Sequence, residues 1–203
     1  MRDSPIEDAI RRRRSIRELH GPPLSSDEVE SLVWLALTAP APHHTQPWRF
    51  VEVSQERRAT LAVGMGQEWQ RDLQHDGVPL AQQERALARS KGQIEDAPTL
   101  LLGCLVTDGL NEYQDDRRRQ AEWGLATHSF GAALQNVLIV ASARGLGAYW
   151  ISAPLYAPEA VRAALDLEQA WQPQAFVALG RPAGNYQPFD RPEPDLGRHF
   201  IRR

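Results

Sequence analysis

The stretch THSFGAALQNVLIVASARG, residues 127–145, forms the second half of a long predicted helix that begins near Asp116. This half is apolar on nearly all sides and rich in small residues, so we expect the helix to be buried all round. In a chain of 203 residues, an interface between subunits is one natural way to cover such a helix. Gly145 and Gly147 are expected to end it.

Downstream of this helix, the pattern predicts strand, helix and strand. Residues 148–152 (AYWIS) and 174–180 (QAFVALG) are typical of strands, and residues 158–167 (PEAVRAALDL) predict an amphipathic helix between them. The tail, residues 185–203, is rich in proline. We expect it to be extended and to wrap another surface rather than to fold alone.

Upstream of the long helix, two further helices precede the first strand. Residues 4–14 predict a short helix, and the sequence GPP at residues 21–23 keeps the chain after it extended. The sequence SSDE at residues 25–28 matches a capping box and starts a second helix, which should stop before Pro40. A loop then leads into the strand WRFVEVS at residues 48–54.

The middle of the chain completes the predicted fold class. Residues 56–93 look helical in pieces, with a break at residues 77–79, and residues 99–107 (TLLLGCLVT) predict a buried strand. The prediction is an α+β fold with roughly four strands and more helices than strands. Residues 1–203 contain no internal repeat or linker, so we expect a single domain.

The composition is that of an ordinary globular protein and excludes several classes. The chain is 42% hydrophobic and 24% charged, with a net charge of -3, which does not favour nucleic-acid binding. No apolar run is long enough to span a membrane, and the amino terminus shows no signal peptide. Cys104 is the only cysteine, so no internal disulfide can form. These features lead us to expect a cytoplasmic protein.

The sequence Arg13-Arg14-Ser15-Ile16-Arg17 is the first candidate for a binding motif. Guanidinium groups supply forked donors that match phosphate oxygens, so three arginines near a helix end could hold a phosphate. The alternative is a solvated basic helix end, which is the usual fate of a charge run.

The loop Pro40–Trp48 (PAPHHTQPW) is the second candidate. Neighbouring histidines on an irregular loop rarely point at one ion, and no acidic or cysteine partner lies at ligand spacing, so we predict no metal site. A rigid, proline-framed loop that carries imidazoles, an amide and an indole suits an aromatic, hydrogen-bonding ligand better.

Other familiar motifs are absent from the sequence. Gly145-Leu-Gly147 follows a helix instead of opening one, so it is not a dinucleotide fingerprint. The sequence has no P-loop and no G-x-S-x-G elbow, and no spacing singles out a catalytic triad. Cys104 lies within an apolar strand and is expected to be an inert core thiol.

The order of motifs along the chain resembles that of the flavin-dependent nitroreductase family. The sequences RRSIR, QPWRF, SFGAALQN, WIS and VALGRP follow one another, and a late arginine completes the set. This resemblance covers essentially the whole chain. It implies a nitroreductase-like fold, with a central, mostly antiparallel sheet flanked by helices, an intertwined homodimer, and FMN as the cofactor.

A narrower resemblance is to the C-terminal reductase domain of the bifunctional protein that completes coenzyme F420 in actinobacteria. It rests on HHTQPWRF, CLVTDG, ALDLEQAWQP and PDL. In that family the N-terminal domain ligates glutamate to the deazaflavin coenzyme, and the reductase domain binds FMN and reduces a dehydro F420 precursor. Because the present chain has no ligase domain, it is either a stand-alone paralogue or an isolated domain.

The nitroreductase resemblance also implies which residues contact FMN. They lie near the amino terminus, on the proline loop, at the end of a strand and in the tail: Arg13, Arg14, Ser15, Ile16, Arg17, Ala41, Pro42, His44, Ile151, Ser152 and Arg191. The first five and the last would hold the phosphate and ribityl chain, and the loop would reach FMN from the other subunit. The strand end would pack against the isoalloxazine ring.

The flavin would carry the redox chemistry, so the protein needs no catalytic acid of its own and we assign none. A flat aromatic or deazaflavin substrate would stack on the ring, with His43 and Trp69 as candidates to line its site. Arg71 is the candidate for an acidic group on the substrate. NAD(P)H and coenzyme F420 are possible electron donors or substrates.

Three other functions are compatible with the same residues. The first is a general nitroreductase or quinone reductase that uses NADH or NADPH. The second is a non-catalytic carrier of flavin or deazaflavin. The third is an enzyme that uses FMN to activate oxygen.

Overall fold

The computed structural model of the chain describes residues 4–184, 186–187, 189 and 191–203. Its centre is an antiparallel sheet of β1 (Leu19–His20), β2 (Trp48–Glu52), β3 (Thr99–Leu105), β4 (Gly147–Ile151) and β5 (Gln172–Pro182). The order is β1-β5-β3-β2, and β4 also pairs with β5. Residues 176–179 pair with both β3 and β4, which therefore lie on opposite sides of β5.

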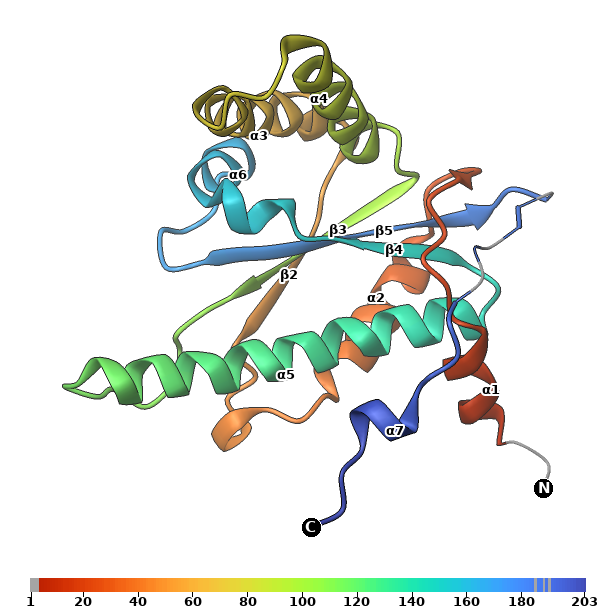
Figure 1. Cartoon of the computed structure of the whole chain (residues 1–203), viewed down its shortest axis with the longest axis vertical. Helices are drawn as coiled ribbons and strands as arrows, with labels where there is room; N and C mark the ends of the chain where they lie inside the picture. Colours follow the sequence, from red (N-terminus) through yellow and green to blue (C-terminus); the bar gives the residue numbers. More distant parts are fainter. Residues whose placement is uncertain (1–3, 185, 188, 190) are drawn as a thin grey trace.

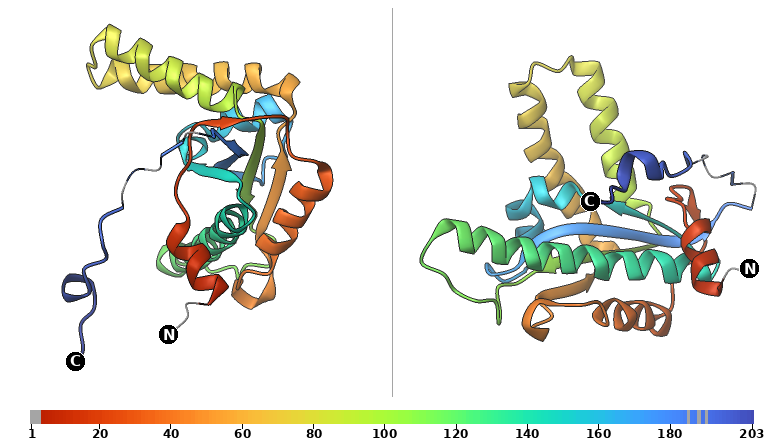
Figure 2. Two further views of the ribbon diagram at one scale, coloured as in Figure 1. Left: turned by 90° about the vertical axis from the view of Figure 1, so that its right-hand side faces the viewer. Right: turned by 60° about the horizontal axis from the view of Figure 1, so that its bottom comes forward.

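Helices cover both faces of this sheet (Figure 1). On one face lie α2 (Ser26–Leu37) and the long α5 (Asp116–Ala143), with α1 (Pro5–Arg12) against the end of α5. On the other face lie α3 (Gln55–His75), α4 (Leu80–Glu95) and α6 (Pro158–Leu165). Figure 2 shows the α3–α4 pair projecting from the body of the molecule.

The apolar run of β3 is explained by burial on both faces. Leu101 and Leu105 belong to the core under α2 and α5, whereas Leu100, Leu102 and Cys104 belong to the core under α3 and α6. Successive side chains of a strand point to opposite faces, so a strand between two helical layers is apolar throughout. The four predicted strands are confirmed, and β1 is a fifth that is only two residues long.

The long predicted helix is confirmed as α5, and Gly145, with a φ of 70°, follows its end. Complete burial is not found within the single chain. Eight residues of α5 are buried, but Leu125 is 48% exposed and Ile139 is half-buried on another face. By length and composition alone α5 could cross a membrane, yet it packs against α2 and the sheet as a core helix does.

The tail departs in part from the prediction of an extended segment. It contains a one-turn helix, α7 (Leu196–His199), whose first turn is capped by the Asp195 carboxylate accepting from Arg198 N–H. All residues of α7 are exposed, and Figure 2 shows this segment running away from the sheet and its helices. Asn185, Pro188 and Asp190 of the predicted tail lie outside the described residues.

Candidate functional site

The segment that follows α1 lies along the outer edge of β4. Helix α1 starts at the Ser4 capping box and ends at Arg12, and the chain then becomes extended at Arg13. Ile16 N–H donates to Ala148 O at 3.0 Å, and this backbone hydrogen bond joins the segment to the outer edge of β4. Gly147 makes this approach possible, because a Cβ there would lie 2.5 Å from Leu19 Cδ2.

Guanidinium groups gather at the start of this segment. Arg14 Nη1 donates to Arg11 O at 2.6 Å, and Arg191 Nη2 from the tail donates to the same oxygen at 3.2 Å. Partial burial lowers the pKa of Arg13, and the charges of Arg191 and Arg14 lower it further. Within the described part of the chain, no carboxylate pairs with Arg13, Arg14 or Arg191. An anion placed among these like charges would relieve their repulsion.

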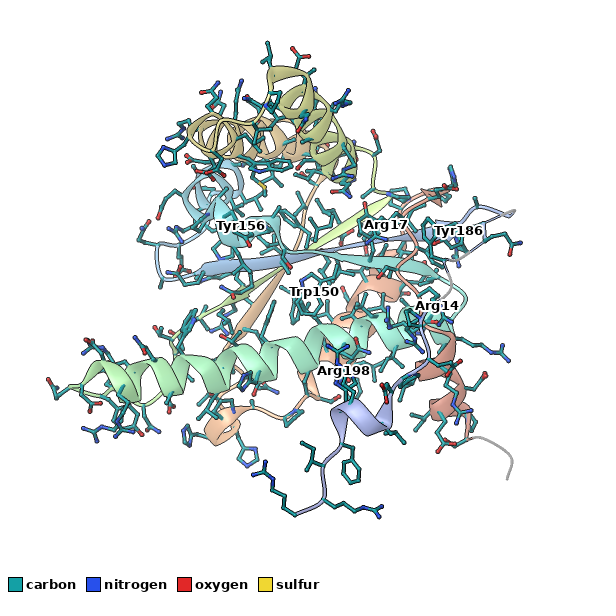
Figure 3. The ribbon with its side chains drawn as sticks, viewed as in Figure 1. Arg14, Arg17, Trp150, Tyr156, Tyr186 and Arg198 are labelled. Carbon is teal, nitrogen blue, oxygen red and sulfur yellow. The ribbon has the colours of Figure 1, made fainter. Side chains whose placement is uncertain are left out.

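A groove of about 240 Å³ lies beside this cluster. Arg14 and Ile16 form one side, Leu138 and Ser142 of α5 form another, and Tyr186 closes it from the tail. The Tyr186 hydroxyl donates to Ser15 O at 3.3 Å, which ties the tail to the segment. Figure 3 shows Arg14, Arg17 and Tyr186 at the same end of α5 and β4.

Farther along, β4 leaves an edge uncovered. Trp150 is 38% exposed, Ile151 is buried and ends the strand, and Ser152 links it to the short helix η2 (Ala153–Tyr156). The guanidinium of Arg17 lies over the ring of Tyr149, 5.8 Å from its centre. Burial raises the pKa of the Tyr149 phenol, against the opposing effect of the Arg17 charge, so this phenol stays protonated at neutral pH.

Two further cavities lie next to each other, and one of them adjoins Arg17. One, of about 300 Å³, is lined by Arg17, Leu19, Tyr149 and part of α4. The other, of about 550 Å³, lies between α3, α4 and η2. Arg89 and Gln93 of α4 line both, so the two cavities share a wall. A volume of several hundred Å³ is typical of small-molecule sites.

The larger cavity has aromatic walls and a charged outer end. Met65 and Trp69 of α3 and Tyr156 of η2 supply the wide apolar surfaces. Asp72 and Asp76 line it at the end of α3, next to the turn that leads into α4. Such walls suit a flat molecule, and the end formed by Asp72 and Asp76 is acidic.

The proline loop lies at another part of the molecule. His43, His44 and Gln46 have φ values of 52°, 57° and 49°, a left-handed conformation that costs energy in residues other than glycine. The loop is anchored through His43, whose Nε2 lies 3.1 Å from Oε1 of the buried Glu122 in α5. Glu122 precedes Ser142 by 20 residues, so this anchor lies about 30 Å along α5 from the groove.

The structure thus separates the expected residues into two groups. One group gathers around β4 and its neighbouring groove: Arg13, Arg14, Ser15, Ile16, Arg17, Ile151, Ser152 and Arg191. The loop residues Ala41, Pro42, His43 and His44 lie apart from that groove in the single chain. No group of metal-ligating side chains occurs among the described residues.

The three expected substrate residues lie in different places. Trp69 lines the larger cavity, and His43 pairs with Glu122. Arg71 does not line that cavity. Instead its exposed guanidinium pairs with Glu68, with a Nη2–Oε1 distance of 2.5 Å.

Sequence reasoning missed the contribution of α4. Ala86, Arg89, Ser90 and Gln93 all line the larger cavity, and their spacing of i, i+3, i+4 and i+7 places them on one helix face. Ala86 and Ser90 are small, and Arg89 and Gln93 have long polar side chains. A helix face that is simply exposed to solvent shows the same pattern. Only the folding of α4 back onto α3 distinguishes the two cases.

Comparison with known proteins identifies the family. The nitroreductase family model matches residues 10–181. The chain is 27% identical over 188 residues to 5,6-dimethylbenzimidazole synthase of Rhodospirillum rubrum, covering 92% of this chain and 83% of the relative. It is also 27% identical over 179 residues to YfhC of Bacillus subtilis, an NAD(P)H nitroreductase by its name, covering 88% and 85% of the two chains.

A solved structure supports the same fold. It is a nitroreductase by its name from Desulfovibrio desulfuricans, in complex with FMN. The TM-score is 0.73, with 24% identity, covering 99% of this chain and 98% of the other. With the family model matching most of its length, the present chain belongs to the nitroreductase family of flavin-dependent oxidoreductases.

Proposed function

We propose that this chain binds FMN along the outer edge of β4 and reduces a flat conjugated substrate in the cavity between α3, α4 and η2. The observation that carries this proposal is the cluster of Arg13, Arg14 and Arg191, which has no carboxylate partner among the described residues. A dianionic phosphate is the complement of such a cluster.

The residues of the edge fit the remainder of FMN. Arg17 lies three residues after Arg14 in the extended segment. Its guanidinium lies over the ring of Tyr149 and places a cation at the uncovered part of β4. The backbone from Trp150 to Ser152 offers polar groups to one edge of a ring. The FMN in the complex of the Desulfovibrio desulfuricans protein supports this choice of cofactor.

Bound FMN would supply the redox chemistry, passing two electrons and a proton as hydride to the substrate after reduction by a donor. The chain's own residues would bind and orient. Arg13 and Arg191 hold the phosphate, Tyr186 closes the tail over the segment, and Trp69 positions a flat substrate. The α3–α4 pair shields the reacting faces from water.

A homodimer is part of the same proposal. The face of α5 that carries Leu125 and Ile139 remains exposed or half-buried, and α7 with the residues after it extends away from the rest of its own chain. A second copy would cover both. It would also bring Ala41, Pro42 and His44 of one chain towards the FMN of the other, which the distance along α5 prevents within one chain.

Several substrates are candidates. The assignment of the dehydro form of a coenzyme F420 precursor as the substrate rests on sequence resemblance alone. A general reductase fed by NAD(P)H is supported by the relative YfhC, which its name describes as an NAD(P)H nitroreductase. Oxygen chemistry on FMN is an alternative from the sequence, and a further relative is named as a 5,6-dimethylbenzimidazole synthase. A non-catalytic carrier would bind FMN without turnover.

The absorption spectrum of the purified chain with added FMN tests the proposal. We expect flavin bands that bleach with a reductant and return when an acceptor is consumed. Return with nitroaromatics or quinones under NAD(P)H supports the general reductase, return with a dehydro-F420 precursor supports the deazaflavin enzyme, and stoichiometric oxygen uptake supports the oxygen chemistry. The absence of flavin bands after FMN addition would overturn the proposal.

A further inference from the structure

Arg89 occupies a position that the nitroreductase resemblance does not assign. It lines both the 550 Å³ cavity between α3, α4 and η2 and the 300 Å³ cavity that contains Arg17. A side chain in this shared wall lies between the proposed cofactor edge and the substrate cavity. It can therefore contact a substrate that reaches towards the flavin.

The charge of Arg89 has no partner in the described part of the chain. By contrast, Arg71 on α3 pairs with Glu68, and Lys91, the next cation along α4, pairs with Glu95 at 3.8 Å. An unpaired guanidinium in the wall of a cavity is a ready donor to a carboxylate or another anionic oxygen group.

The charged groups that line the cavity are unevenly distributed along it. Asp76 follows the end of α3 at the turn, whereas Arg89 lies about 14 Å along α4 from Leu80. The acidic groups Asp72 and Asp76 therefore lie towards the turn, and the cation of Arg89 lies farther from the turn along α4. An anionic substrate is repelled from the outer end and attracted towards the wall that the two cavities share.

The walls between these charges are aromatic and apolar. Trp69 and Tyr156 offer flat faces, and Met65 and Ala153 close the inner side. A conjugated ring fits between them, with its anionic group directed at Arg89.

We propose that Arg89 makes this cavity selective for flat conjugated substrates that carry an anionic oxygen group, such as a carboxylate. The inference rests on the proposed function and deepens it by naming the substrate class. It transfers to Arg89 the role that the sequence assigned to Arg71. Gln93, which shares the same wall, is placed to donate a second hydrogen bond to the group.

The test compares 4-nitrobenzoate with 4-nitrobenzamide, its neutral isostere, in wild-type chain and in Arg89→Met. The matched control is Arg85→Met, which removes an exposed arginine one turn earlier on α4 that lines neither cavity. FMN-loaded protein gives KM and kcat for both probes with a saturating electron donor. Isothermal titration calorimetry gives their Kd without turnover.

We expect wild type to prefer 4-nitrobenzoate, and Arg89→Met to raise its KM and Kd by about tenfold or more while kcat changes little. Values for 4-nitrobenzamide and for Arg85→Met should stay unchanged, and Arg89→Lys should recover part of the preference. Equal losses for both probes, no loss in Arg89→Met, or a wild type without preference would each overturn the inference.

The cofactor is measured separately, so that the two proposals fail in different ways. Arg89→Met should hold FMN as wild type does. A loss of FMN from this variant alone would make Arg89 a cofactor residue and overturn the inference. If wild type itself binds no FMN, the proposed function fails, and calorimetry on the unloaded chain still decides whether Arg89 recognises the anion.

Discussion

His43 Nε2 and Glu122 Oε1 lie 3.1 Å apart, and this contact joins the left-handed proline loop to the long central helix. Asn111 contacts both groups. Its backbone N–H donates to the same carboxylate oxygen at 3.0 Å, and its side-chain nitrogen lies 2.8 Å from His43 Nε2. Glu122 is only 6% exposed, so its carboxylate depends on these partners.

The first prediction concerns this anchor. Replacing Glu122 with Ala removes an acceptor shared by His43 and Asn111 and should lower the free energy of unfolding by about 1–3 kcal/mol. Urea denaturation measures this change. Glu112→Ala is the control, because Glu112 is exposed nearby, and it should have little effect. Equal stability of the two variants would show that the anchor contributes nothing.

The second prediction concerns the proposed phosphate site. Arg191→Gln should raise the Kd for FMN by about tenfold or more, since a hydrogen bond to a charged group is worth about 1.5–3 kcal/mol. The loss should be smaller for riboflavin, which has no phosphate. Arg202→Gln, in the exposed end of the tail, is the control. A loss that is the same for FMN and riboflavin would contradict the phosphate assignment. Fluorescence titration of the flavin provides both constants.

The third prediction concerns the second copy. Ile139→Glu places a charge on the half-buried face of α5, where the chain itself leaves the side chain partly exposed. If a second copy covers this face, burial of that charge prevents association, and light scattering should report a monomer. Val63→Glu introduces the same charge at an exposed site on α3 and should leave the oligomer intact. A monomeric wild type would rule out the proposed dimer.

Element boundaries could be predicted where they have a local chemical signal. The capping boxes that begin at Ser4 and Ser25 are both formed, and Gly145 adopts the positive φ that follows a helix end. The two-residue β1 and the one-turn α7 could not be predicted, because neither is long enough to carry a periodic pattern.

The positions of the candidate site residues relative to one another could be predicted only where they belong to one segment of chain. Arg13 to Arg17 are neighbours in sequence and remain neighbours along β4. The choice between Arg71 and Arg89 depends instead on how α3 and α4 pack and on which arginine finds a carboxylate within its own helix. Glu68 lies three residues before Arg71 and pairs with it, whereas Arg89 has no such pairing in the described residues.

The fourth prediction concerns the buried thiol. Burial raises the pKa of Cys104 to about 12, and the charge of Arg162 opposes this only in part. The native thiol should therefore stay protonated and unreactive towards Ellman's reagent at pH 8, and react once urea unfolds the chain. Rapid reaction of the native chain would show that β3 opens more readily than its burial implies.

The same pKa shift makes stability depend on pH. Above the ordinary thiol value of 9.0 the unfolded chain ionises and the folded chain does not, so the contribution is complete below pH 9 and is lost as pH rises towards 12. Cys104→Ala should remove this part of the alkaline loss. Parallel denaturation curves of wild type and variant at pH 7 and pH 10 separate the contribution of Cys104 from those of other titrating groups.

The fifth prediction tests whether the close approach at Gly147 shapes the cofactor edge. In Gly147→Ala the new Cβ would meet Leu19 Cδ2 at 2.5 Å and Ile16 Cγ2 at 3.1 Å, so the Leu19 side chain must turn aside and the Ile16 side chain must shift slightly away from β4. Overpacking of this kind costs about 1–3 kcal/mol of stability. Because Arg17 follows Ile16 directly, the same shift should weaken FMN binding.

Gly124→Ala is the matched control, since a Cβ there meets nothing within 4 Å. It lies within α5, where alanine favours the helix, and should leave FMN binding unchanged. If Gly147→Ala bound FMN as wild type does, the position of this segment would not determine the cofactor site.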